Sequence, residues 1–198
     1  MQVSVYLGHM GNVNSVITLE QLAQDFTSLF TRRVFRLEAL DYYDAPNERE
    51  PLARFRAGEP VDPAWREPWK KLVTEVRKSG RIMERVHIVS EPVSEYTRFS
   101  LLHGYPASVE AGEDVRIISR AAAAASGLPT ADYWLFDDDL LAMLVYETDG
   151  RIRIVRLYRD EDFLERAQRG RDKAMRFAVP LAQYVAEHKI SNERTKAA

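Results

Sequence analysis

The stretch from Tyr133 to Tyr158, YWLFDDDLLAMLVYETDGRIRIVRLY, most constrains the fold of this 198-residue chain. It contains three runs rich in aliphatic and aromatic residues, separated by Asp137-Asp138-Asp139 and by Thr148-Asp149-Gly150. Such separators are typical of β-hairpins, because aspartate caps its own turn and glycine accepts the positive φ that tight turns require. The sequence therefore predicts a three-stranded antiparallel meander, with strands near 133–137, 140–148 and 151–158.

The triple aspartate also raises the question of a metal or acid/base site. A hard cation such as Ca²⁺ needs six or more oxygen ligands, which converge from several elements. Three adjacent aspartates on one turn point in different directions, and the alternating acidic pattern of a calcium loop is absent. The hairpin turn is therefore the favoured interpretation, and no metal site is predicted.

The segment before the meander contains two helix starts. Thr18-Leu19-Glu20-Gln21 has the pattern of a capping box, and apolar residues at helical spacing follow it, which predicts a helix near 19–30. Asp62-Pro63 begins a second helix, which Pro68 divides into a short turn and a main helix from about residue 67. Residues 44–62 are rich in proline and charge, and are expected to form a long connection.

The remaining pattern predicts further strands and helices. Strands are expected near 33–38, 81–89 and 115–119, with a helix after the capping residue Ser94. A long helix begins at Asp160, and Pro180 should kink it or break it. The fold class expected is α+β, with a central, mostly antiparallel sheet of about five strands flanked by helices and an N-terminal helical segment.

The expected organisation has four parts. Residues 1–16 are expected to be a tail that can derive from cloning, and residues 189–198 a frayed C-terminus. Between them, residues 17–80 form the N-terminal helical segment and residues 81–188 the α/β core.

Composition excludes several classes of function. With 28 basic and 30 acidic residues, the net charge of −2 does not supply the basic surface expected of a protein that binds nucleic acid directly. The chain has no cysteine, which excludes disulfides, thiolate nucleophiles and cysteine zinc sites, and a cytoplasmic location is expected. No apolar run approaches the roughly 20 residues that span a membrane. No cofactor is expected.

The most distinctive polar segment runs from Ser90 to Phe99, SEPVSEYTRF. It places Glu91, Tyr96 and Arg98 just beyond a predicted strand, where α/β folds gather ligand-binding groups. The alternative is a strand-to-helix turn with a capping serine and a surface ion pair.

Two weaker pairs of candidate ligand-binding residues are Asp132 with Trp134, at the entry of the meander, and Arg171 with Asp172, in the last helix. No catalytic residue is assigned, since no nucleophile or phosphate-loop motif is present. The histidines are scattered, and His87, in the middle of a strand, is expected to have a surface or hydrogen-bonded structural role.

Three long segments resemble a family of uncharacterised actinobacterial proteins. They are RVHIVSEPVSEYTRFSLLHGYPASVEAGEDVRIISR, LPTADYWLFDDDLLAMLVYETDG and RDKAMRFAVPLAQYV, and LEALDYYDAPNEREPLARFRAGEPVDPAWREPWKKLV fits as well. The resemblance covers roughly 19–186. It implies, by association, a role beside the XRE-type helix-turn-helix regulators near which such proteins are encoded.

The order of elements is also similar to half of a phospholipase D-like domain. The catalytic H-x-K signature of that superfamily is absent, because no lysine stands two residues after a histidine. A degenerate domain of this kind would bind a ligand or a partner without cleaving it.

These observations lead to two functional hypotheses. The first is a non-enzymatic cytoplasmic domain that binds a partner protein, such as a helix-turn-helix regulator, or a small-molecule ligand in a regulatory system. The alternative is an enzyme that acts on a small substrate through a pocket at the strand ends.

Overall fold

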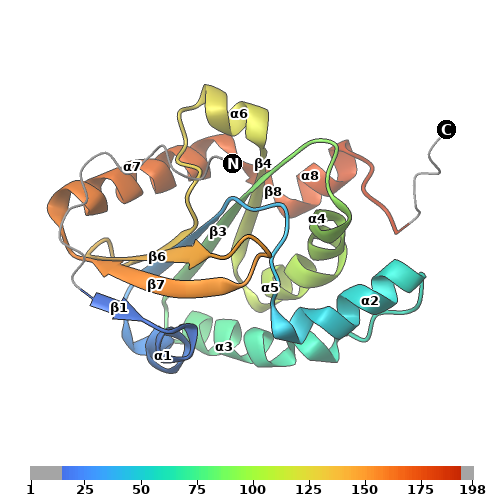
Figure 1. Ribbon diagram of the computed structural model, residues 1–198, viewed down its shortest axis with the longest axis horizontal. Coiled ribbons are helices and arrows are strands. Elements are labelled where there is room, and N and C mark those ends of the chain that lie inside the picture. Colours follow the sequence, from blue (N-terminus) through green and yellow to red (C-terminus); the bar gives the residue numbers. More distant parts are fainter. Residues whose placement is uncertain (1–14, 193–198) are drawn as a thin grey trace.

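The computed structural model describes residues 15–192 and shows an α+β fold built on one mixed sheet (Figure 1). The strand order across the sheet is β1-β7-β6-β5-β2-β3-β4-β8. The strands are β1 (Ser15–Ile17), β2 (Arg33–Glu38), β3 (Ile82–Val89), β4 (Asp114–Ser119), β5 (Tyr133–Phe136), β6 (Leu140–Tyr146), β7 (Ile152–Tyr158) and β8 (Val179–Pro180).

Helices cover both faces of this sheet. In Figure 1, α6 and α7 lie above it and α1 to α3 lie below it. The α-helices are α1 (Leu19–Asp25), α2 (Arg49–Ala57), α3 (Glu67–Lys78), α4 (Glu95–Phe99), α5 (Tyr105–Ala111), α6 (Arg120–Ala125), α7 (Glu161–Phe177) and α8 (Leu181–Glu187).

The expected α+β class and flanking helices are confirmed, while the sheet has more strands than expected and is mixed, although most of its strand pairs are antiparallel as expected. The described residues form eight strands where about five were expected, and β2, β3 and β4 run parallel to one another. The parallel pairs arise because α2 with α3, and α4 with α5, form the long crossovers that parallel neighbours require. The edge strands β1 and β8 have three and two residues, too few for an alternating pattern to reveal them.

Local signals place most elements where the sequence predicted them. Thr18 and Gln21 form the complete capping box of α1, and a 3₁₀ turn (Pro63–Arg66) precedes α3. The predicted last helix is broken near Pro180, since α7 ends at Phe177 and Pro180 is the residue immediately before α8. The expected connection at 44–62 contains one helix that was missed, α2, whose side chains Leu52 and Phe55 are buried.

Part of the expected N-terminal tail belongs to the sheet. Ser15 and Val16, assigned to the expected tail, instead form β1 and pair with β7. The rest of that tail, residues 1–14, and residues 193–198 of the expected frayed end lie outside the described residues. The segment before residue 80 also supplies β2, which pairs with β3 and β5, so it shares one sheet with the later segment.

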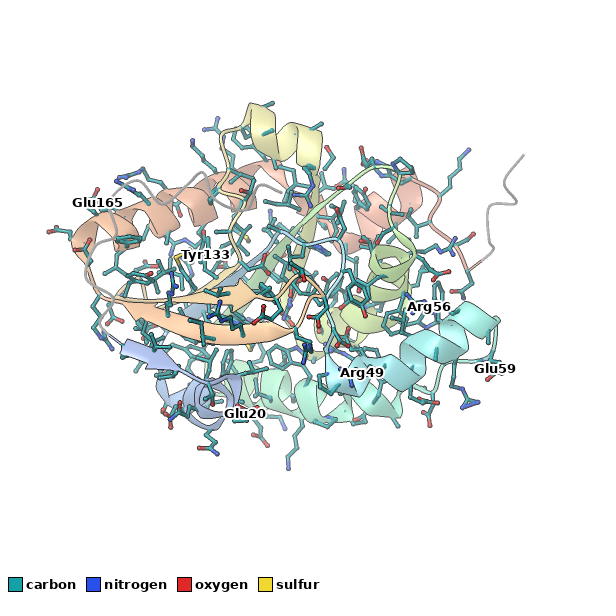
Figure 2. All side chains as sticks on the ribbon, viewed as in Figure 1. Glu20, Arg49, Arg56, Glu59, Tyr133 and Glu165 are labelled. Atoms are coloured by element: carbon teal, nitrogen blue, oxygen red, sulfur yellow. The ribbon has the colours of Figure 1, made fainter. Side chains whose placement is uncertain are left out.

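Two apolar layers hold the sheet between the helices. On the α7 side, Phe35, Leu37, Val86 and Ile88 are fully buried, and Figure 2 shows Tyr133 lying inside this layer. The hydroxyl of Tyr133 donates to the carbonyl oxygen of Ala167 in α7, at 3.0 Å. The opposite layer packs α1 and α3 against the other face of the same strands.

The triple aspartate forms the turn between β5 and β6, as predicted. Asp137 and Asp138 adopt positive φ values of 50° and 71°, which aspartate tolerates better than most residues. The Asp137 carboxylate accepts hydrogen bonds from the backbone amides of Thr31, Arg32 and Arg33, and so ties this turn to the start of β2. Partial burial opposes ionisation, but these donors lower the pKa of Asp137 from 3.8 to about 2.

The substitution Asp137→Asn should lower the free energy of unfolding at pH 7 by about 1–2 kcal/mol, because charge-assisted hydrogen bonds are lost while the turn conformation is kept. Since the folded-state pKa is lowered, the stabilisation by the carboxylate is complete above the unfolded-state pKa and disappears as the pH falls toward 2. Urea unfolding at pH 7 and near pH 2 should therefore show a difference between variant and wild type that shrinks in acid. The matched control is Asp139→Asn, whose side chain is 68% exposed. An equal loss of stability in both variants would contradict the assignment.

Candidate functional site

A band of charged side chains lies on the face of the sheet that α1 and α3 cover, where apolar residues would be expected. These helices lie below the sheet in Figure 1. Strand alternation directs Arg36 and Glu38 of β2 to the same face as Arg85 and His87 of β3. The register places Arg36 opposite Arg85 on one side and Trp134 on the other, and Glu38 opposite His87. Helices cover this face, so all four charged or imidazole side chains are at most 8% exposed.

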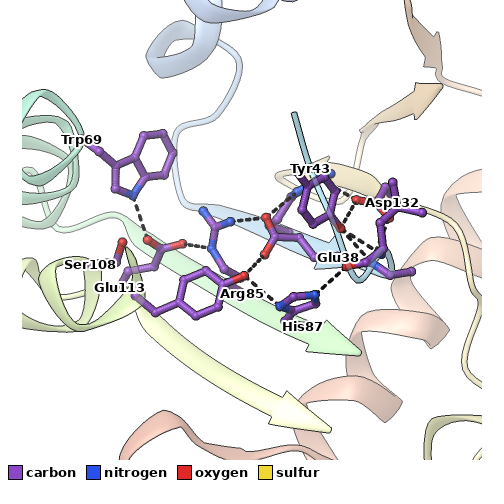
Figure 3. A network of polar contacts seen from close by, with 12 residues as sticks. Glu38, Tyr43, Trp69, Arg85, His87, Ser108, Glu113 and Asp132 are labelled. Atoms are coloured by element: carbon purple, nitrogen blue, oxygen red, sulfur yellow. Dashed lines mark hydrogen bonds and ion pairs between the residues drawn. The ribbon is translucent and has the colours of Figure 1, made fainter. Parts of the chain in front are cut away.

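Arg85 is the centre of the ion pairs in this band (Figure 3). Its Nη1 contacts Glu38, and its Nε donates to Oε1 of Glu113 at 2.8 Å. Trp69 of α3 donates its indole N–H to the other Glu113 oxygen, at 3.0 Å. Two carboxylates therefore share one guanidinium, and each of them has a further hydrogen-bond donor.

Glu38 also connects the band to an aromatic and imidazole pair. The hydroxyl of Tyr105 donates to Oε2 of Glu38 at 2.7 Å and lies 2.9 Å from Nδ1 of His87. Nε2 of His87 donates to the carbonyl oxygen of Leu40 at 2.9 Å, so the expected hydrogen-bonded role of this histidine is found. Burial would raise the pKa of Glu38, but Arg85 and Arg36 outweigh it and lower that pKa to about 2.

Asp132 anchors the other end of the band. Its carboxylate accepts from Nη2 of Arg36 at 2.8 Å, from the backbone amide of Ala39 at 2.8 Å and from the Tyr43 hydroxyl at 2.7 Å. Burial raises the pKa of Asp132 in spite of these partners. Asp132 therefore fixes the position of the Arg36 side chain and of the backbone at the end of β2.

A cavity of about 240 Å³ opens over this band. A π-helical turn (Ser100–Gly104) between α4 and α5 lines one side, and such turns occur frequently at functional sites. We call the part of the cavity lined by Glu48 and Arg66 its polar end, and the part lined by Trp69, Leu144 and Ile152 its apolar end. The lining residues are Leu19, Arg36, Glu38, Tyr43, Ala45, Glu48, Arg66, Trp69, Arg85, Tyr96, Ser100, Gly104, Tyr105, Trp134, Leu144, Tyr146 and Ile152, and together they define the sheet pocket.

Two arginines of the sheet pocket have hydrogen-bonding capacity that the protein does not use. Nη1 of Arg36 and Nε of Arg66 are buried and have no hydrogen-bond partner. Burial and the neighbouring Arg85 lower the pKa of Arg66, which indicates that its charge is poorly compensated. The charge of Glu48 is also poorly compensated, because burial raises its pKa although the Tyr96 hydroxyl donates a hydrogen bond to it at 2.5 Å.

The structure distributes the residues predicted from the sequence over three places. Tyr96 and Trp134 line the sheet pocket, and Asp132 lies directly behind it. Glu91 and Arg98 line a separate surface hollow next to α8, where Tyr184 donates to Glu91 at 2.8 Å.

The pair Arg171 and Asp172 lies in α7, on the opposite side of the sheet. Arg171 contacts Asp138 of the β5–β6 turn, and its Nη2 lies 2.9 Å from Asp172. These two residues therefore belong neither to the sheet pocket nor to the hollow that Glu91 and Arg98 line.

Sequence reasoning missed the charged residues of the sheet pocket, Arg36, Glu38, Glu48, Arg66 and Arg85, and it also missed Glu113, which pairs with Arg85. Charged residues at alternate positions of a strand usually indicate a solvated face. The usable signal was the long crossover that joins β2 to β3, since parallel strands in such units are covered on both faces. Charges on such strands are therefore buried.

Comparison with known families places the chain in one of them. A family model described as a domain of unknown function, DUF6879, matches residues 20–186. The chain belongs to this family. The comparison with curated proteins gave no match.

Two further structural observations concern broad classes of site. Within residues 15–192, no helix is long and apolar enough to cross a membrane. In the same range, no group of three or more histidine, aspartate or glutamate side chains is arranged so that it could hold a metal ion.

The substitution Glu38→Gln should lower the free energy of unfolding by about 3 kcal/mol, because it leaves Arg36 and Arg85 buried with too little negative charge. Equilibrium urea unfolding at pH 7 measures the change. The control is Glu165→Gln, which changes an exposed carboxylate on α7 (Figure 2) and should alter stability by no more than about 0.5 kcal/mol. A Glu38 variant as stable as this control would show that the buried band does not stabilise the fold.

Proposed function

We propose that this protein is a cytoplasmic small-molecule-binding domain, and that the ligand occupies the sheet pocket. The observation that carries the proposal is the pair of buried, unpartnered donors on Arg36 and Arg66, next to a cavity. A buried donor without an acceptor costs about 1–3 kcal/mol, and native proteins rarely leave such groups unsatisfied. A ligand with acceptor atoms would supply the missing partners.

The aromatic walls of the sheet pocket support the same function. Trp69 and Trp134 lie with their ring centroids 6.2 Å apart, and the guanidinium carbon of Arg36 lies 5.4 Å from the Trp134 ring centre. Ligand pockets are typically mostly apolar and aromatic, with a few fixed polar groups that orient the bound molecule. The rings and buried ion pairs of this pocket are held by the sheet and by α3, so the site is formed before a ligand arrives.

A role in regulation is the second part of the proposal. The resemblance to proteins encoded beside XRE-type regulators supports a helix-turn-helix protein as the partner that responds to the ligand. In this scheme the domain itself does not contact DNA, which agrees with its net charge of −2.

An enzymatic function is the alternative, and one observation favours it. Glu38 is held ionised, with a pKa of about 2, whereas burial raises the pKa of Glu48 in the same pocket. Two carboxyl groups with separated pKa values are the arrangement that general acid and base chemistry requires. A retained substrate that is converted during incubation would favour this alternative.

The test is capture of ligands from an actinobacterial lysate on the full chain, followed by mass spectrometry of the retained small molecules and proteins. Arg66→Met should reduce the retained small molecule about tenfold or more, because the guanidinium donors are lost while an unbranched, flexible side chain is kept. The matched control is Arg169→Met, on the exposed surface of α7, which should retain the wild-type amount. Circular dichroism and the urea midpoint establish that both variants fold.

Three outcomes would contradict parts of the proposal. Equal retention by Arg66→Met and wild type would remove the sheet pocket as the binding site. Retention of no small molecule by the wild-type chain would contradict the binding function. Failure to enrich a helix-turn-helix regulator over a bead control would contradict the regulatory part alone.

A further inference from the structure

Two oppositely charged side chains of the sheet pocket do not pair with each other. Arg66 donates Nη2 to the Ser108 hydroxyl at 2.8 Å and leaves its buried Nε without a partner. Glu48 accepts from the Tyr96 hydroxyl through Oε2, and its other oxygen, Oε1, has no hydrogen-bond donor among the described residues. Neither residue forms an ion pair within the described chain, although both line the same cavity.

The sheet pocket thus offers a cationic donor and an anionic acceptor at its polar end. Burial raises the pKa of Glu48 and lowers the pKa of Arg66, because the attraction between the two side chains, which form no ion pair, offsets only part of the cost of burying their charges. A ligand with a single negative charge would satisfy Arg66 and repel Glu48, and a ligand with a single positive charge would do the reverse. A ligand with both charges close together would satisfy both residues.

The apolar end of the pocket begins one helical turn from Arg66. Trp69 follows Arg66 by three residues at the start of α3, so the two side chains lie on the same side of the helix. Trp69 packs in the same apolar cluster as Leu144 and Ile152, which also line the cavity. An apolar group attached to the charged part of the ligand would therefore lie along Trp69.

We infer that the ligand of the sheet pocket is a free α-amino acid with an apolar side chain. Its carboxylate pairs with Arg66, its ammonium pairs with Glu48, and its side chain packs against Trp69 toward Leu144 and Ile152. A cavity of about 240 Å³ is small for a ligand site, which suits a molecule of this size better than a nucleotide or a peptide. The inference rests on the proposed small-molecule function and adds the chemical class of the ligand.

The test is isothermal titration calorimetry of the full chain with L-phenylalanine and L-leucine. Removing one charged group at a time from phenylalanine gives phenethylamine and 3-phenylpropionate, and each should bind about tenfold more weakly or not at all. N-acetyl-L-phenylalanine and L-phenylalanine amide distinguish a free amino acid from the end of a peptide, because each blocks one of the two charges. Both should also bind at least about tenfold more weakly.

Two variants assign each charge to its residue. Glu48→Gln keeps a hydrogen-bond acceptor for Tyr96 but loses the negative charge that pairs with the ligand ammonium. This variant should therefore bind L-phenylalanine and 3-phenylpropionate with similar affinity. Arg66→Met should bind L-phenylalanine no better than phenethylamine. The control Arg169→Met should reproduce every wild-type affinity, and circular dichroism excludes unfolding.

The outcomes separate this inference from the function on which it rests. If the wild-type chain binds neither amino acid but retains another small molecule from the lysate, the ligand class is wrong and the binding function stands. If 3-phenylpropionate binds as tightly as L-phenylalanine, the role of Glu48 is wrong. If no ligand is retained and no titration gives heat, both the inference and the proposed function fail.

Discussion

The fold depends on the compensation of buried charge across β5, β2 and β3. Arg85 lies between Glu38 and Glu113, and Arg36 lies between Glu38 and Asp132, so each guanidinium on this face has a carboxylate on either side. Charges of this kind are costly to bury, and their mutual attraction offsets the cost only when the geometry is kept. The helices that cover this face must therefore supply fixed partners, and they do so through Trp69 and Tyr105. The position of α3 and α5 is set by polar contacts as well as by apolar packing.

Several elements could be predicted from the sequence because their signals are local. The capping box at Thr18 and the glycine at position 150 act within four residues, and the turn at Asp137 adopts the conformation that its residue type favours. The long last helix could be predicted because its apolar residues repeat over many turns. Each of these features is fixed by its neighbours in sequence, so knowledge of the rest of the chain was unnecessary.

The sheet pocket could not be predicted in the same way, because its parts come together only through strand register. Arg36, Arg85 and Trp134 are separated by many residues, and only the pairing of β2 with both β3 and β5 brings them into one row. Tyr96 was identified because it lies in a distinctive polar segment just beyond a predicted strand, and Trp134 because it lies with Asp132 at the entry of the meander. Glu48 lies in the proline-rich region 44–62 that was expected to be a connection, and Arg66 lies in the short turn expected before the main helix. Neither residue had a pattern to distinguish it. Sequence periodicity describes one element at a time, whereas this site belongs to five or more elements together.

The two edges of the sheet restrict how this protein can associate with others. β1 has three residues, and β8 has two, of which Pro180 has no backbone N–H to donate. A neighbouring chain that paired with β1 or β8 would find few free backbone groups on these short strands to hold it. Edge-to-edge polymerisation and recognition of extended peptides by strand addition are thereby disfavoured. Short edge strands of this kind favour association through the side chains of helices and loops over association through the sheet backbone.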